Sequence, residues 1–137
     1  SFFSLKIDEG PLVGLNIPQF VRASKQTIPS SPNMSGVNPV TIASNQTFTW
    51  TSSGADWIQI QMYHRNTSNF IDSNIICVVE DDGLFTIPNG LHQNWVSGEA
   101  VYVQFSRVFE SNTTLPHNNS EARVIGSYTV TGAGFMN

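Results

Sequence analysis

The densest group of acidic side chains is Glu80-Asp81-Asp82, which follows closely on the only cysteine, Cys77. Adjacent carboxylates can bind a cation, but a calcium loop needs oxygen ligands at alternating positions around a longer loop than this one. The Asp82-Gly83 pair lies between apolar segments, which is typical of a hairpin because both central residues of a type I′ turn need positive φ. The sequence therefore predicts a hairpin between a strand ending near Glu80 and another starting at Leu84, with the three carboxylates in solvent at its tip. Cys77 is predicted to be a small core residue.

The three histidines, His64, His92 and His117, are far apart in the sequence, and each is predicted to lie in a loop. The chain has no HExxH or GxSxG motif, and the glycine-containing segment 131–135 is followed by no helix that could bind phosphate. An enzyme would need these histidines to converge with a carboxylate in a cleft. The sequence predicts no enzyme, no catalytic residue, no metal site and no cofactor, and a triad assembled from distant residues is the alternative.

Aromatic and amide side chains share one face of two predicted strands, 57–63 and 101–109. Aromatic rings stack on sugars and are enriched in protein interfaces, and amides bond to hydroxyl groups. If the two strands are neighbours, these side chains form a flat binding surface. The predicted ligand-binding residues are Trp57, Gln59, Gln61, Tyr63, Tyr102 and Gln104. The alternative is an ordinary sheet surface, because aromatic side chains favour strands in any case.

The elements that carry these residues are predicted from an alternation with a period of two. Inward positions include Phe48 and Trp50, then Ile58, Ile60 and Met62, then Val101, Val103 and Phe105. Such alternation marks antiparallel strands with one buried face. The segment 75–79 is apolar at every position, which predicts a more deeply buried strand. About seven short strands with turn signals every 8–12 residues predict an all-β, immunoglobulin-like antiparallel β-sandwich, with a jelly roll or small barrel as the alternative.

Residues 1–40 differ from the rest because they hold five of the seven prolines and little regular alternation. We interpret them as an extended N-terminal arm that lies along a sheet or leads in from an upstream module, and residues 41–137 as the β-sandwich domain. Phe2, Phe3, Leu5 and Ile7 could add a strand to the sheet edge of a neighbouring molecule.

The composition excludes some partners and favours a compartment. The net charge is −4, and the six basic residues are scattered, so neither nucleic acid nor a membrane surface is a predicted partner. No apolar run is long enough for direct membrane insertion. Asn, Ser and Thr make up 40 of the 137 residues, and five Asn-x-Ser/Thr sequons occur, at Asn33, Asn45, Asn66, Asn112 and Asn118. This surface chemistry favours an extracellular or cell-surface location.

Three segments, FTWTSSGADWIQIQM, IICVVEDDGLFTIP and GEAVYVQFSRV, resemble a pattern in uncharacterised secreted proteins and lipoproteins of predatory and gliding bacteria. The matching residues are Trp50, Asp56, Trp57, Cys77, Asp82, Gly83, Phe85 and Pro88. The resemblance covers residues 47–108 approximately and implies an extracellular, immunoglobulin-like β-sandwich module. It supplies no activity and no site residues.

Together these observations predict a non-enzymatic extracellular surface module for adhesion, with a protein or a glycan on a surface as its partner. The alternative is a structural subunit of a fibre or coat that self-assembles through its N-terminal arm.

Overall fold

The computed structural model describes residues 2–6, 16–22, 29–34, 39–65, 71–92, 94–115 and 118–137. Within these residues the protein is all-β, as predicted, with nine strands and no helix. Thus no helix of the described residues is long and apolar enough to cross a membrane. The strands are β1 (Phe2–Lys6), β2 (Asn16–Arg22), β3 (Val40–Ile42), β4 (Thr47–Thr49), β5 (Trp57–Arg65), β6 (Ile71–Val79), β7 (Leu84–Thr86), β8 (Ala100–Thr114) and β9 (Glu121–Met136).

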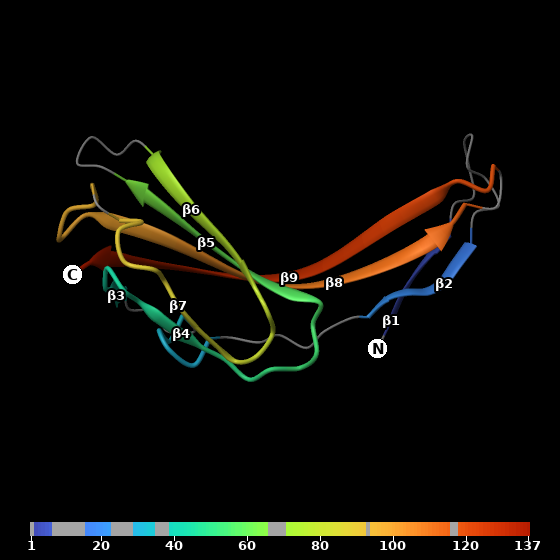
Figure 1. The fold of residues 1–137 in the computed structure, drawn as a ribbon, viewed down its shortest axis with the longest axis horizontal. Helices are drawn as coiled ribbons and strands as arrows, with labels where there is room; N and C mark the ends of the chain where they lie inside the picture. The colour runs from blue at the N-terminus through green and yellow to red at the C-terminus, as the bar shows by residue number, and fades with distance from the viewer. Residues whose placement is uncertain are drawn as a thin grey trace.

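The main layer is a five-stranded sheet in the order β3-β9-β8-β5-β6, which curls into a half-barrel (Figure 1). β4 and β7 form a small antiparallel sheet beside it. The large sheet is mixed, whereas the sequence predicted only antiparallel pairing, because the short strand β3 runs parallel to β9. This pairing depends on Gly134, since a Cβ at that position would lie 2.1 Å from the carbonyl oxygen of Val40.

The core lies between the concave face of the half-barrel and the small sheet. Ile58, Ile60 and Met62 of β5 alternate with more exposed neighbours and are fully buried, as predicted. The inward residues of β8 are buried in the same way, and Trp50 packs on Phe105 with ring centroids 5.2 Å apart. Each such side chain contributes about 1.5–3 kcal/mol when it leaves water. The predicted alternation between buried and wet faces is therefore confirmed for β5 and for β8 as far as Phe105. Beyond it the alternation stops, because Ser106, which was predicted to point outward, is buried together with residues 107–109.

β6 does not form the deeply buried strand that its apolar run predicted. Ile76 and Val78 are 53% and 62% exposed, whereas Cys77 is partly buried and packs against the core. Burial raises the pKa of the Cys77 thiol. The prediction for the strand was wrong because β6 is the last strand of the sheet and only its inner face is covered. An apolar run alone does not reveal which side of a strand lacks a neighbour.

β8 and β9 continue past the half-barrel as a long two-stranded ribbon, and the β1–β2 hairpin lies along its far end (Figure 1). β2 contacts both strands of this ribbon. Residues 29–34 lie against the body of the domain instead, where Ser31 bridges to Thr49 and Met34 is buried in the core. The predicted boundary between residues 40 and 41 falls inside β3.

Candidate functional site

The two strands that carry the predicted ligand-binding residues are neighbours in the large sheet. Tyr63 of β5 lies directly opposite Tyr102 of β8, and Gln61 lies opposite Gln104. Directly opposed side chains in an antiparallel pair have Cβ atoms about 4.5–5.5 Å apart and lie on the same face. The structure therefore brings these four residues together on the convex side of the half-barrel.

We call this surface the outer face. It is defined by the six predicted residues Trp57, Gln59, Gln61, Tyr63, Tyr102 and Gln104, together with Asn74, Ile76 and Val78, which lie opposite them on β6. Tyr102 is 37% exposed and the other five predicted residues are half-buried. The surface thus combines aromatic rings, amides and apolar side chains over three adjacent strands.

Two arginines lie against the aromatic rings of the outer face and were missed by the sequence reasoning. The guanidinium carbon of Arg65 is 5.1 Å from the centroid of the Tyr102 ring, and that of Arg123 is 5.6 Å from the Trp57 ring. Arg123 also pairs with Glu110 at 2.6 Å. Positions 57 to 65 alternate in burial, so Arg65 continues the outward series of β5 and could have been found from that period. These contacts place a guanidinium at each end of the outer face, and that of Arg123 is neutralised by Glu110.

The acidic segment is a corner between two sheets and not the predicted hairpin. β6 pairs with β5 in the large sheet, whereas β7 pairs with β4 in the small sheet. Gly83 has a φ of 97°, but Asp82 does not have positive φ, so the type I′ turn is not formed. The Asp82 carboxylate instead accepts a hydrogen bond from the Leu84 N–H at 3.1 Å. The sequence identified the change of direction correctly and its geometry wrongly.

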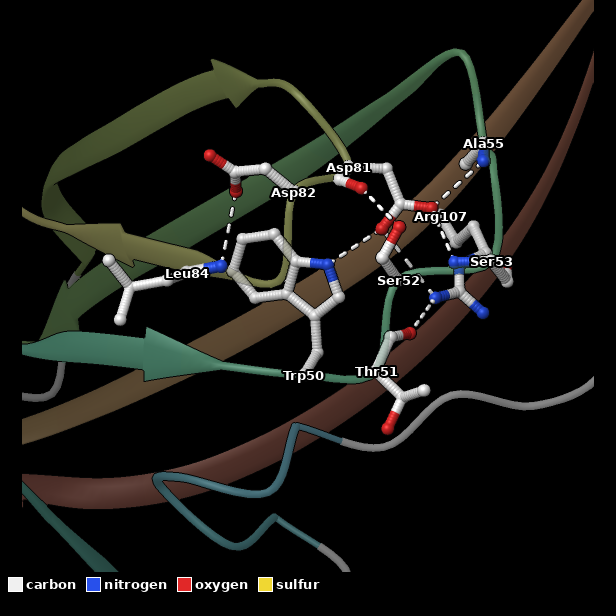
Figure 2. Close-up of polar contacts among 9 residues, drawn as sticks. All are labelled: Trp50, Thr51, Ser52, Ser53, Ala55, Asp81, Asp82, Leu84 and Arg107. Carbon is white, nitrogen blue, oxygen red and sulfur yellow. Dashed lines mark hydrogen bonds and ion pairs between the residues drawn. The ribbon is translucent and has the colours of Figure 1, made fainter.

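Asp81 is buried, which corrects the prediction that all three carboxylates lie in solvent. Its side chain is 2% exposed and accepts hydrogen bonds from the Trp50 indole N–H at 2.7 Å and from the N–H groups of Ser53 and Ala55 at 3.0 and 2.8 Å (Figure 2). The Arg107 guanidinium lies 3.7 Å away and donates to the Thr51 carbonyl at 2.6 Å. The carboxylate therefore joins the corner, the segment after β4 and strand β8.

The environment of Asp81 keeps it ionised. Burial by itself raises its pKa, but the backbone N–H groups of Ser53 and Ala55, the Trp50 indole and the charge of Arg107 together lower the pKa below the ordinary value. Each of these groups favours the charged form. We assign Asp81 a structural role, since its carboxylate is buried and links three segments of the chain.

His64 and His92 both contact the ring of Trp95. His64 stacks on it with centroids 5.0 Å apart, and His92 meets it edge-on at 4.7 Å. The Nε2 atom of His64 is 2.5 Å from the Glu99 carboxylate. The prediction of a loop position was wrong for His64, which lies within β5 and is 1% exposed, and His117 lies outside the described residues. The histidines at positions 64 and 92 therefore do converge with a carboxylate, around a tryptophan.

The cluster of His64, His92, Trp95 and Glu99 attaches the segment before β8 to the end of β5. Glu99 also accepts a hydrogen bond from the Val96 N–H at 3.1 Å, and the Trp95 indole donates to the Ser73 hydroxyl at 2.6 Å. Burial lowers the pKa of His92, and the nearby Ser44 backbone offsets only some of this effect. Among the described residues, no three His, Cys, Asp or Glu side chains form a group that could hold a metal ion.

Comparison of the chain with protein-family models, curated proteins and solved structures gave no match.

Proposed function

We propose that the protein is a non-enzymatic extracellular module that binds a protein or a glycan on a surface through its outer face. The observation that carries this proposal is the register of β5 and β8, which sets Tyr63 against Tyr102 and Gln61 against Gln104. Paired rings beside paired amides offer a sugar both a stacking surface and hydrogen-bond partners for its hydroxyl groups. The same combination suits a protein partner, because interfaces are enriched in aromatic residues and arginine.

We further propose that β3 to β9 form a variant of the immunoglobulin-like sandwich. In that fold one sheet contains strands C, F and G, with C′ added in variable-type domains, and the other contains A, B and E. The order β9-β8-β5-β6 corresponds to G-F-C-C′, and β4 paired with β7 corresponds to B paired with E. The bridge between Ser31 and Thr49 takes the position of strand A. The resemblance to secreted bacterial proteins and lipoproteins supports the extracellular location.

The positive charge of Arg65 at one end of the outer face adds a preference to this proposal. Its guanidinium lies over the Tyr102 ring, whereas Arg123 at the other end is paired with Glu110. A ligand with a carboxylate or sulfate group would gain a charge-assisted hydrogen bond from an arginine without leaving the stacking surface. We therefore expect acidic glycans or acidic protein segments to bind better than neutral ones.

The test is binding of the protein to a printed glycan array and to immobilised extracellular matrix proteins. Replacing Tyr63 and Tyr102 together by alanine should reduce binding at least tenfold, because each ring contact contributes about 0.5–1.5 kcal/mol beyond its buried area. Trp57→Ala should weaken it as well. Ile125→Ala is the matched control, since Ile125 is 54% exposed but lies on the ribbon. Unchanged binding by the double variant, with its unfolding curve preserved, would reject the assignment.

A further inference from the structure

β6 is a long and apolar edge strand, and the one irregularity in its pairing with β5 lies near its start, between Ile71 and Ser73. It is the last strand of the five-stranded sheet, and it is nine residues long, whereas the strand at the opposite edge, β3, has three. Sheet edges are usually blunted by lysine, proline, bulges or very short strands. The β6 sequence, IDSNIICVV, contains no lysine and no proline and has a single charged residue, Asp72. In Figure 1 β6 forms the upper border of the half-barrel, with no described segment beyond it.

The side chains of β6 from Ile75 onward add apolar surface to this edge, which pairs with no other described strand. Ile76 and Val78 point to the outer face and are 53% and 62% exposed. Ile75, Cys77 and Val79 point inward and are packed against the core. A strand that paired with this edge would pack beside Ile76 and Val78 on the outer face. On the inner face it would extend the core beyond Ile75, Cys77 and Val79. The edge therefore fits a partner strand that is apolar on both faces.

We propose that β6 pairs antiparallel with β6 of a second copy of this protein, about a twofold axis through Cys77, so that two half-barrels share one continuous sheet. This register sets Ile76 opposite Val78 on the outer face and Ile75 opposite Val79 on the inner face. It sets the one charged residue at the strand end, Glu80, opposite the amide of Asn74. Apolar side chains thus face apolar ones, and the strand is complementary to itself.

Other registers of the same strand are poorer. A twofold axis through Ile76 sets the polar side chains of Ser73 and Asn74 opposite Val79 and Val78. An axis through Ile75 sets them opposite Cys77 and Ile76. A shift by a single residue would set the inner side chains of one copy beside the outer side chains of the other. Polarity and face pattern together select the axis through Cys77.

The proposed interface is small, so the association is weak and depends on concentration. It joins the seven residues from Asn74 to Glu80 of each chain along one edge, well short of the roughly 800 Å² per partner of a standard stable interface. We expect a monomer at micromolar concentration and a dimer in the high-micromolar range or where copies are crowded on a surface. In the dimer the two outer faces lie side by side, which gives any surface ligand two adjacent sites.

The test is sedimentation velocity of the whole chain from low-micromolar to near-millimolar concentration, together with thiol oxidation. Opposed residues of an antiparallel pair have Cα atoms about 4.5–5.5 Å apart, which a disulfide can span. Diamide, which is reduced as the two thiols are oxidised, should therefore give a covalent dimer through Cys77. Val78→Lys should weaken the association at least tenfold and reduce the covalent dimer. Leu84→Lys, at a position 57% exposed on β7, is the matched control and should change neither.

Three results would overturn the proposal. The first is a monomer at every concentration with no diamide-dependent dimer. The second is association that Val78→Lys leaves unchanged, which would place the contact elsewhere, for instance in the N-terminal arm. The third is equal loss of association in Val78→Lys and Leu84→Lys, which would indicate general apolar adhesion. Because the Val78 side chain points outward, Val78→Lys should keep the unfolding midpoint of the parent, and Ile76→Lys provides a second variant should it not.

Discussion

Replacing Asp81 by alanine tests the structural role of the corner. The change removes the acceptor for the Trp50 indole and the two N–H groups of Ser53 and Ala55, and it removes the carboxylate 3.7 Å from the buried Arg107 guanidinium. Ser53 is exposed, so water can replace the carboxylate there. The indole and the guanidinium are buried, and for them no such replacement is available without opening the corner.

The expected cost follows from these two buried groups. Removing one partner of a buried charge pair typically costs about 3–5 kcal/mol, and an unsatisfied buried donor costs about 1–3 kcal/mol. Since these effects overlap at one site, we expect Asp81→Ala to lower the free energy of unfolding by about 3–5 kcal/mol. This is a large share of the roughly 5–15 kcal/mol that stabilises a typical domain.

Urea unfolding followed by tryptophan fluorescence and circular dichroism measures this loss. Asp82→Ala is the matched control. Asp82 is exposed and, among the described residues, its carboxylate accepts only the hydrogen bond from the Leu84 N–H. Its replacement should therefore lower the free energy of unfolding by less than about 1 kcal/mol. Arg107→Met supplies a second comparison. In that background Asp81→Ala should cost at least about 1 kcal/mol less than in the parent, because the two side chains are coupled.

The pH dependence gives an independent check on the same carboxylate. Its folded-state pKa is lowered, so the stability that it contributes is complete above the unfolded pKa of about 3.9 and is lost as pH falls through the folded value. The difference in unfolding free energy between the parent and Asp81→Asn should therefore shrink below pH 4 approximately. The reasoning is refuted if Asp81→Ala and Asp82→Ala destabilise equally, or if the difference does not change in acid.

Two further predictions concern a glycine and a histidine. Gly134→Ala should destabilise the domain by about 2 kcal/mol or more, because its Cβ would overlap the backbone of Val40. The control Gly132→Ala should cost less, because its Cβ meets only the flexible side chain of Met34, at 3.0 Å. Urea unfolding compares the two variants, and equal costs would contradict the contact between Gly134 and Val40. The pKa of His92 is lowered in the folded protein, so as pH falls the unfolded chain takes up a proton at this residue before the folded chain does. The free energy of unfolding should therefore fall below a pH of about 6.5, by up to about 1.4 kcal/mol per pH unit. His92→Phe keeps an aromatic ring and should remove this contribution to the pH dependence in unfolding measurements at pH 7.5 and 5.5, whereas an unchanged dependence would assign it to another group.

The all-β class and the inward positions of β5 and of the first part of β8 could be predicted because one face of each is covered there and the other is not. A period of two then appears directly in the sequence, as in Ile58, Ile60 and Met62. The sequence did not show that β5 and β8 are neighbours, so the binding surface was predicted only for the case that they are. Strand order depends on how distant segments pack, and no local pattern encodes it.

Two of the errors concern buried charged and polar residues. Arg107 continues the series Val103, Phe105, and His64 continues the series Ile60, Met62, so the period had already placed both inside. A buried charged or polar group needs a partner, and Asp81 and Glu99 supply one from other elements. The sequence reasoning treated polarity as a sign of solvent, and it therefore assigned Asp81 to a wet tip and His64 to a loop.

The parallel pairing of β3 with β9 has a mechanical consequence. Pulling on the amino end of β3 and on Asn137 would slide the two parallel strands past each other. All hydrogen bonds between β3 and β9 would then bear the force together, including the 2.9 Å bond from the Asn137 N–H to the Ile42 carbonyl. A hairpin pulled apart at its open end breaks one bond at a time. We therefore expect this edge to resist pulling until it ruptures in a single event, and gradual lengthening at low force in single-molecule extension would contradict that expectation.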